Sequence, residues 1–225
     1  MNPLVSIISP VRNGAEWIAE SIGSVHSQTY QPIEMIVVDD GSTDRSAQVA
    51  RDLGVTVRQQ PPRGQPAALN TGLKASQGEF VGFLDADDLY PPRRVESMID
   101  MLRDREDADG VFGLMEEFAD DEAGTLRKLR PAAPSRHPNC MLLRRTFVQR
   151  IGPFDETFEL ASVPAWLAVA QASGARLVGI DEVVLLRRLH SSNMGLTRWS
   201  ERAEYARAMH AGLVAGRKLK GDSQP

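Results

Sequence analysis

The chain has 225 residues, of which 42% are hydrophobic, and its net charge is −4. This length suits one large domain, or one domain with a short appendage, and is enough to bury a substantial core. The mild negative charge argues against nucleic acid as a partner, because nucleic-acid-binding proteins usually present a strongly basic face.

The N-terminus shows no targeting signal. Residues 1–10 lack a basic segment before their apolar run, and that run is too short for a secretory signal or a membrane span. The single cysteine, Cys140, excludes an internal disulfide, fits a reducing compartment and is expected to be a buried apolar residue. We expect a cytoplasmic protein, with attachment to the inner face of a membrane left open.

The first half of the chain alternates between strand-like and helix-like segments. Short apolar, β-rich runs predict buried strands over 4–9, 33–38, 55–59 and 80–84. Helical spacing and turn residues predict helices ending near residue 28 and covering 44–53, 65–76 and 92–105. Ser42 or Thr43 is expected to cap the second of these helices. This alternation predicts an α/β protein with a mostly parallel, Rossmann-like central sheet and helices on both faces.

After residue 106 the alternation becomes looser. Strands are predicted over 110–118, 125–129, 139–143 and 176–186, and helices over 144–150, 163–173 and 198–220. Between them, 130–138 reads as a proline-rich, basic loop. We expect a domain over 1–195, with a first half over 1–106 and a smaller, less regular second half over 107–195. A C-terminal helix and tail would follow over 196–225, packed on the domain, with peripheral membrane association as the alternative.

The stretch from Phe80 to Asp88, FVGFLDADD, ends an apolar run in three acids. In open α/β sheets, ligands bind beyond the carboxyl ends of the strands. Clustered carboxylates repel one another unless a cation joins them, and Asp85 and Asp87 point the same way if the segment is extended. Oxygen ligands of this kind suit Mg²⁺ or Mn²⁺. The alternative is that Asp87 and Asp88 cap the turn and helix that follow.

A second acidic pair, Asp39 and Asp40, ends the strand predicted over 33–38. Two acidic strand ends at one edge of a parallel sheet favour a ligand site there. The dinucleotide, P-loop, hydrolase and zincin motifs GxGxxG, GxxxxGK[ST], GxSxG and HExxH do not occur.

Four ordered pieces of the chain resemble the family 2 glycosyltransferases, which have the GT-A fold. They are VSIISPVRNGAEWIAESIGSVHSQTYQPIEMIVVDDGSTD at 5–44, AALNTGLKASQGEFVGFLDADD at 67–88, IGPFDE at 151–156 and RRLHSSNMG at 187–195. The resemblance implies a hexosyltransferase-type enzyme that uses a nucleotide-sugar donor, usually a UDP or GDP sugar. It also implies that 1–106 is the nucleotide-binding half of the domain and 107–195 the acceptor-side half. It also implies inversion at the transferred sugar and a Mn²⁺ or Mg²⁺ cofactor. The acceptor, a glycan, a lipid phosphate or a small molecule, stays open, as does the oligomeric state.

The resemblance also assigns roles to individual residues. Around the nucleotide it places Pro10, Val11, Arg12, Asn13, Asp39, Gln65 and Asp40, the last matching the acid that hydrogen-bonds the base. Asp85 matches the first acid of the family's DxD motif, near the ribose and the metal. Asp87 matches the direct metal ligand, with a role in catalysis, and His190 lies where some members place a further metal or diphosphate contact.

Two departures from the family pattern stand out. Arg12 replaces an aromatic residue, so a guanidinium plane is expected to stack where a ring would. Ser162 and Val163 replace the acidic pair whose aspartate acts as general base, and neither side chain can accept a proton from a hydroxyl at neutral pH. A positioned base contributes about 10²–10⁴ in rate, so its loss matters.

Three explanations for the missing base remain open. A nearby acid replaces it, Glu159 first, with Asp155, Glu156 and Asp181 behind. Alternatively, the acceptor is already ionised, and is held by some of the arginines at 130, 136, 144, 145, 187 and 188. In the third, the protein binds a nucleotide sugar or a glycan without catalysis. A nucleotidyltransferase is disfavoured because no glycine-rich triphosphate loop follows the first strand.

Overall fold

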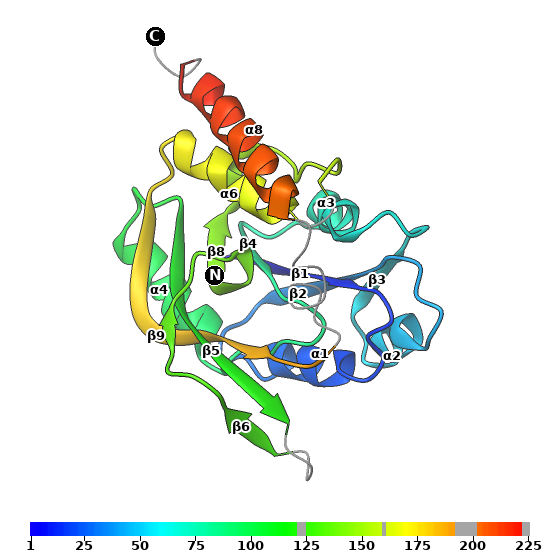
Figure 1. The fold of residues 1–225 in the computed structure, drawn as a ribbon. Coiled ribbons are helices and arrows are strands. Elements are labelled where there is room, and N and C mark those ends of the chain that lie inside the picture. The colour runs from blue at the N-terminus through cyan, green and yellow to red at the C-terminus, as the bar shows by residue number, and fades with distance from the viewer. Residues whose placement is uncertain (121–124, 159–160, 192–201, 222–225) are drawn as a thin grey trace.

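The computed structural model describes residues 1–120, 125–158, 161–191 and 202–221. Within these residues, nine strands form one sheet in the order β3-β2-β1-β4-β8-β5-β6, with β7 and β9 also paired to β5 (Figure 1). The strands are β1 (Val5–Val11), β2 (Ile33–Asp39), β3 (Thr56–Gln59), β4 (Phe80–Phe83), β5 (Gly110–Asp120), β6 (Leu126–Lys128), β7 (Ala133–Pro134), β8 (Met141–Arg144) and β9 (Leu177–Arg188). The helices are α1 (Ile18–His26), α2 (Ser46–Asp52), α3 (Gln65–Ala75), α4 (Arg94–Asp104), α5 (Arg145–Ile151), α6 (Ser162–Ala172) and α8 (Arg202–Gly221).

The N-terminal half is the predicted parallel unit. Strands β3, β2, β1 and β4 are all parallel and are linked through α1, α2 and α3. Alternate residues of β1 face opposite layers, since Ile7 packs with α1 and α4 while Ile8 packs with α3, α5 and α6. Figure 1 shows α1 and α2 beneath the sheet and α6 and α8 above it. The predicted mostly parallel sheet with helices on both faces is therefore confirmed.

The second half adds antiparallel strands. Strand β8 runs antiparallel to both β4 and β5, and the predicted pairing of 125–129 with the preceding strand is the β5–β6 hairpin. The segment predicted as one strand or two over 176–186 is the single strand β9, which runs parallel to β5 with two register shifts. This long pairing carries the chain back across the molecule, so that β9 ends at the same edge as β4 and β5.

Two local expectations were wrong. Pro10 lies inside β1, opposite Val38, and not in the loop that follows. Proline is tolerated there because Ile8, two residues earlier, accepts the Leu84 N–H from the β4 side, so Pro10 faces that side beyond the last β4 pairing. Neither Ser42 nor Thr43 caps α2; Asp44 Oδ1 accepts the Ser46 N–H at 2.9 Å.

The predicted loop over 130–138 contains the short strand β7, and its end begins a 3₁₀ helix at Pro138–Cys140. This 3₁₀ turn shortens the strand predicted over 139–143, which starts at Met141. Cys140 is fully buried, and burial raises the pKa of its thiol to about 11. The expectation of a buried cysteine is therefore confirmed.

The IGPFDE segment fastens α6 to the sheet. The Asn70 side chain accepts the Phe154 N–H and donates to the Phe154 carbonyl, both at 2.9 Å. The Phe154 ring stacks on Trp166 of α6 at 4.9 Å, and the Trp166 indole N–H donates to the Gly152 carbonyl at 2.9 Å. The IGPFDE segment, one of the four pieces that resemble the family, therefore has a packing role.

Helix α8 packs closely across α6 (Figure 1). Gly212 and Gly216 face Ala165 and Val169, and a Cβ at either glycine would overlap their carbonyl oxygens. Glycine at these two positions is what lets the backbones of the two helices approach. None of the described helices combines the length and the apolar character needed to span a bilayer.

Replacing Gly72 by alanine should destabilise the protein. Gly72 lies on α3 directly over β1, where a Cβ would overlap Ile8 Cγ2. We expect Gly72→Ala to lower the free energy of unfolding by about 1–3 kcal/mol, the usual range for overpacking a core. The matched control is Gly23→Ala on α1, where a Cβ meets nothing within 4 Å. That variant should be neutral or stabilised by about 0.4–1 kcal/mol in urea unfolding. Equal stability of the two variants would contradict this packing.

Candidate active site

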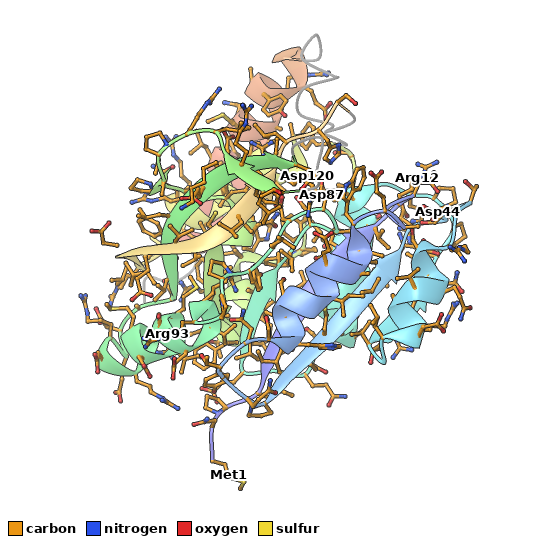
Figure 2. All side chains as sticks on the ribbon, turned by 90° about the horizontal axis from the view of Figure 1, so that it is seen from below. Met1, Arg12, Asp44, Asp87, Arg93 and Asp120 are labelled. Atoms are coloured by element: carbon orange, nitrogen blue, oxygen red, sulfur yellow. The ribbon has the colours of Figure 1, made fainter. Side chains whose placement is uncertain are left out.

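The loops after β1 and β2 are joined side by side. Asn13 adopts a left-handed conformation, with φ of 55°, which asparagine tolerates better than most residues. Its side-chain carbonyl accepts the Thr43 N–H at 2.8 Å, and its own N–H donates to Ser42 Oγ at 2.9 Å. Ala15 N–H donates to Asp44 Oδ2 at 3.0 Å. Asn13 thus shapes the loop, and the neighbouring Arg12 is exposed (Figure 2).

The two acids at the end of β2 are buried and organise the loops around them. Asp39 accepts the Ser42 N–H at 3.1 Å and the Gln59 side-chain amide at 3.0 Å. Asp40 accepts the backbone N–H groups of Arg63 and Gly64 at 2.9 and 2.8 Å, and the Gln60 amide at 2.7 Å. Asp40 therefore holds the loop that leads into α3 in place. The sequence did not predict this structural role.

The three acids after β4 converge. One oxygen from each of Asp85, Asp87 and Asp88 lies within 4.8 Å of the other two. The expected extended geometry was wrong, because Asp88 N–H donates to the Asp85 carbonyl at 3.1 Å and closes a turn. The turn, and not the alternation of a strand, brings the carboxylates together. Figure 2 shows Asp87 at the same end of the molecule as Asp120, opposite Met1 and Arg93.

Asp85 lies between amide donors and a like charge. The Gln65 amide donates to its Oδ1 at 3.0 Å, and Asn139 adds a second side-chain hydrogen bond. Burial, followed by repulsion from Asp87, nevertheless raises the pKa of Asp85 from 3.8 to about 6. The position of Gln65 links α3, and through it the loop held by Asp40, to the acidic turn.

Asp88 points into the protein. Its side chain is buried and accepts the Arg188 N–H at 3.0 Å. Burial, together with the charges of Asp85 and Asp87, raises the pKa of Asp88 well above its ordinary value. The alternative that Asp88 caps the following helix was wrong, since this carboxylate contacts β9.

Asp87 meets the end of β9 through His190. His190 Nε2 lies 2.9 Å from Asp87 Oδ2, and the imidazole stacks on Trp17 with ring centroids 4.2 Å apart. Two residues earlier, the Arg188 Nε–H donates to the Asp87 carbonyl at 3.0 Å. The side chain and the backbone of Asp87 are therefore both held by β9 and the two residues that follow it.

These donors fit a divalent cation. Carboxylate oxygens and an imidazole nitrogen at half-buried positions match the preferences of Mg²⁺ and, more closely, of Mn²⁺. Burial, followed by repulsion among the acids, raises the pKa values of Asp85 and Asp88, and a bound cation would stabilise the ionised carboxylates. Asp87, Asp85 and His190, the predicted metal ligands, lie together, and Asp88 joins them.

Several arginines proposed for an ionised acceptor lie elsewhere. Arg144 donates to the Ala108 and Leu102 carbonyls, and Arg145 to the Gly78 carbonyl, all at the edge where β4 begins. The assignment of these two arginines to the acceptor was therefore wrong. Arg187 and Arg130 pair with Glu117 near the site, and Arg136 lies over the Phe112 ring.

Among the acids proposed as the general base, Glu159 lies outside the described residues. Asp155 accepts from the Thr157 N–H and hydroxyl, and Glu156 is paired with Arg63 at 2.6 Å. Asp181 is an exposed residue seven positions before the end of β9. Ser162 is buried at the start of α6.

Four residues near the acidic turn were not predicted from the sequence to lie there. Trp17 fitted the apolar face of a helix, and its stacking on His190 depends on a segment far away in sequence. Asn139 lies in a 3₁₀ turn after a proline-rich loop, which carries no motif. Glu20 and Asp120 are unremarkable acids whose partner is Arg188. Only the folded arrangement brings these side chains together.

Several known proteins are similar to this chain over most of its length. The family model described as Glycosyl transferase family 2 matches residues 6–158. An uncharacterized glycosyltransferase of Rickettsia typhi is 32% identical over 224 residues, covering 91% of this chain and 70% of that protein. A relative from Rickettsia conorii, also an uncharacterized glycosyltransferase, is 30% identical, and the match covers 89% of this chain and 36% of that longer protein.

Two solved structures share the fold. S. aureus TarS in complex with UDP-GlcNAc gives a TM-score of 0.78 at 19% identity, covering 94% of this chain and 66% of that one. The mannosyltransferase PcManGT from Pyrobaculum calidifontis, in complex with GDP-Man and Mn²⁺, gives a TM-score of 0.66 at 20% identity. That match covers 100% of this chain and 77% of the other. The family and the fold expected from the sequence are thus confirmed: the chain belongs to glycosyltransferase family 2, a family of transferases, and has the GT-A fold.

Proposed function

We propose that this protein transfers a sugar from a UDP or GDP sugar to an acceptor, with inversion, using Mg²⁺ or Mn²⁺ held by Asp87, Asp85 and His190. The observation that carries the proposal is the convergence of three carboxylates beside the loops after β1 and β2. The complexes of TarS with UDP-GlcNAc and of PcManGT with GDP-Man and Mn²⁺ support it by analogy.

The donor would lie across the carboxyl ends of β1, β2 and β4. Pro10 and Val11 form its floor, and Arg12 and Asn13 its wall, with the exposed guanidinium free to stack on a base. Asp39 and Asp40 keep the neighbouring loops in place, and Asp40 Oδ2 retains acceptor capacity for the base. The nucleotide-binding half over 1–106 supplies all of these groups.

At the reacting end, Gln65 and Asn139 hold the Asp85 carboxylate while His190 holds that of Asp87. A divalent cation, when bound, supplies Lewis-acid stabilisation of the leaving diphosphate. The chain's own part is to keep its ligands aimed at one point before the donor arrives, so that no reorganisation is needed during transfer.

For the acceptor side, formed by residues 107–195 with the C-terminal helix region beyond it, we keep Glu159 as the proposed general base. The acceptor would be a glycan or a small-molecule alcohol. A lipid phosphate needs no base, and that acceptor class would explain the replacement of the family's acids by Ser162 and Val163.

A second candidate function follows from those same two residues. Without a base, the protein would bind a nucleotide sugar or glycan for a partner and not transfer the sugar. Slow hydrolysis of the donor distinguishes the two. Release of UDP or GDP from a panel of nucleotide sugars with Mn²⁺ favours an enzyme. Binding without release favours a protein that only binds the nucleotide sugar.

Removing the carboxylate of Asp87 should abolish metal-dependent binding and turnover. We expect Asp87→Ala to lose at least about 100-fold in Mn²⁺-dependent affinity for UDP or GDP, and donor turnover with it, because the ion loses its principal ligand. Isothermal titration and nucleotide release measure the two effects. The control is Asp100→Ala, which removes an exposed acid of α4 that pairs with Arg103. Undiminished nucleotide affinity of Asp87→Ala with Mn²⁺ present would refute the assignment.

The stability of the metal-free protein should fall with rising pH. Asp85 has a pKa of about 6 in the folded protein against 3.8 ordinarily, and that of Asp88 shifts the same way. Both groups therefore bind protons more readily when folded. The stability that Asp85 contributes below about pH 4 is lost as the pH rises through about 6, and Asp88 acts in the same direction. Mn²⁺ binds the ionised carboxylates and should restore stability mainly above that pH.

Thermal melting at about pH 5 and about pH 8, with and without Mn²⁺, tests this expectation. Asp85→Asn should raise the melting temperature of the metal-free protein at the higher pH and remove most of the Mn²⁺-induced increase. Asp100→Asn, at the opposite edge, should behave like the wild type. An equal effect of Mn²⁺ at both pH values would be incompatible with carboxylates that titrate in this range.

A further inference from the structure

Arg188, the last residue of β9, is an unusually enclosed cation. Its side chain is 2% exposed, and its partners lie on α1, on β5 and in the turn after β4. Removing a guanidinium from water is unfavourable unless its donors are satisfied. Where those donors point therefore indicates what the side chain does.

Among the described residues, the guanidinium contacts partners in three directions. Its Nε–H bonds to the Asp87 carbonyl at 3.0 Å, one Nη bonds to Glu20 of α1 at 2.5 Å, and the other to Asp120 at the end of β5. The Phe118 ring lies beneath the cation, 4.8 Å from its centroid. A planar guanidinium can satisfy three such partners at once, whereas a lysine ammonium lacks this fixed fork.

The backbone of the same residue completes the contact with the acidic turn. Arg188 N–H donates to Asp88 Oδ1 at 3.0 Å, so Arg188 holds the turn both at Asp87 and at Asp88. Glu20 and Asp120 in turn anchor the guanidinium to α1 and β5. The acidic turn is thus tied to α1 and β5 through the backbone carbonyl of Asp87 and the side-chain carboxylate of Asp88.

We infer that Arg188 is a positioning residue that holds the turn over 85–88 in the conformation in which its carboxylates converge on a metal ion. The inference rests on the proposed function, because it assumes that Asp87 and Asp85 bind the ion. Arg188 makes no use of its charge toward the donor in this role; it acts through the Asp87 carbonyl and the Asp88 carboxylate.

The test measures the binding of Mn²⁺ alone, without a sugar donor. The electron paramagnetic resonance signal of the free ion reports how much Mn²⁺ stays unbound. Arg188→Lys keeps the charge but loses the three-way fork, and should weaken Mn²⁺ affinity by about 10- to 100-fold, as removal of an outer-shell partner usually does. Arg188→Lys should also lower the melting temperature.

The matched control is Arg144→Lys. Arg144 likewise donates to two backbone carbonyls and lies over a phenylalanine ring, that of Phe80, but at the opposite edge of the sheet. Arg144→Lys should lower the melting temperature while leaving Mn²⁺ affinity unchanged. A merely structural role for Arg188 would give the same result as this control, and that result would overturn the inference.

A second variant keeps the test decisive if Arg188→Lys does not fold. Glu20 is 59% exposed at its side chain and anchors one arm of the guanidinium, so Glu20→Ala should fold and still weaken Mn²⁺ binding. Glu96→Ala, which removes an exposed ion pair with Arg93 on α4, is its control and should leave Mn²⁺ binding unchanged. Equal Mn²⁺ affinity in Glu20→Ala and the wild type would overturn the inference.

The two proposals fail differently. A wild-type protein that bound no Mn²⁺, with or without UDP or GDP, would remove the proposed metal site and this inference with it. A wild type that bound Mn²⁺, with Arg188→Lys binding it equally well, would leave the proposed function intact and reject only the role of Arg188.

Discussion

Repulsion among three carboxylates at one edge of the sheet is the constraint around which this protein is built. Asp85, Asp87 and Asp88 lie close enough for burial and mutual charge to raise the pKa of two of them. Such a cluster persists only where the surrounding structure holds it. The turn hydrogen bond, the amides of Gln65 and Asn139 and the contacts from β9 are what hold it here.

The loops after β1 and β2 follow the same principle. Asp39 and Asp40 are buried charges, and each is satisfied by backbone or amide N–H groups of loops that would otherwise be independent. Burying a carboxylate without such partners is unfavourable, so the loops adopt the one arrangement that supplies them. The result is a site whose walls are set by hydrogen bonds made before any ligand arrives.

The second half of the fold serves the first. Strand β9 runs back beside β5 and delivers Arg188 and His190 to a turn about one hundred residues earlier in the chain, while Phe154 and Trp166 dock α6 on the face of α3 and α5. The fold that results is the GT-A fold of the family to which the chain belongs.

The sequence alone determined the alternating strands and helices, the edge at which the acids lie and the family, because hydrophobic periodicity and contiguous motifs are local signals. Tertiary structure decided the rest. Pairings between distant segments decide four features of the site. Asp40 accepts hydrogen bonds from the loop before α3, and Arg144 and Arg145 lie at the opposite edge. Trp17 stacks on His190, and Arg188 contacts the acidic turn. The register of β9 against β5 and the close approach of packed elements set those pairings, and neither is written in any short stretch of residues.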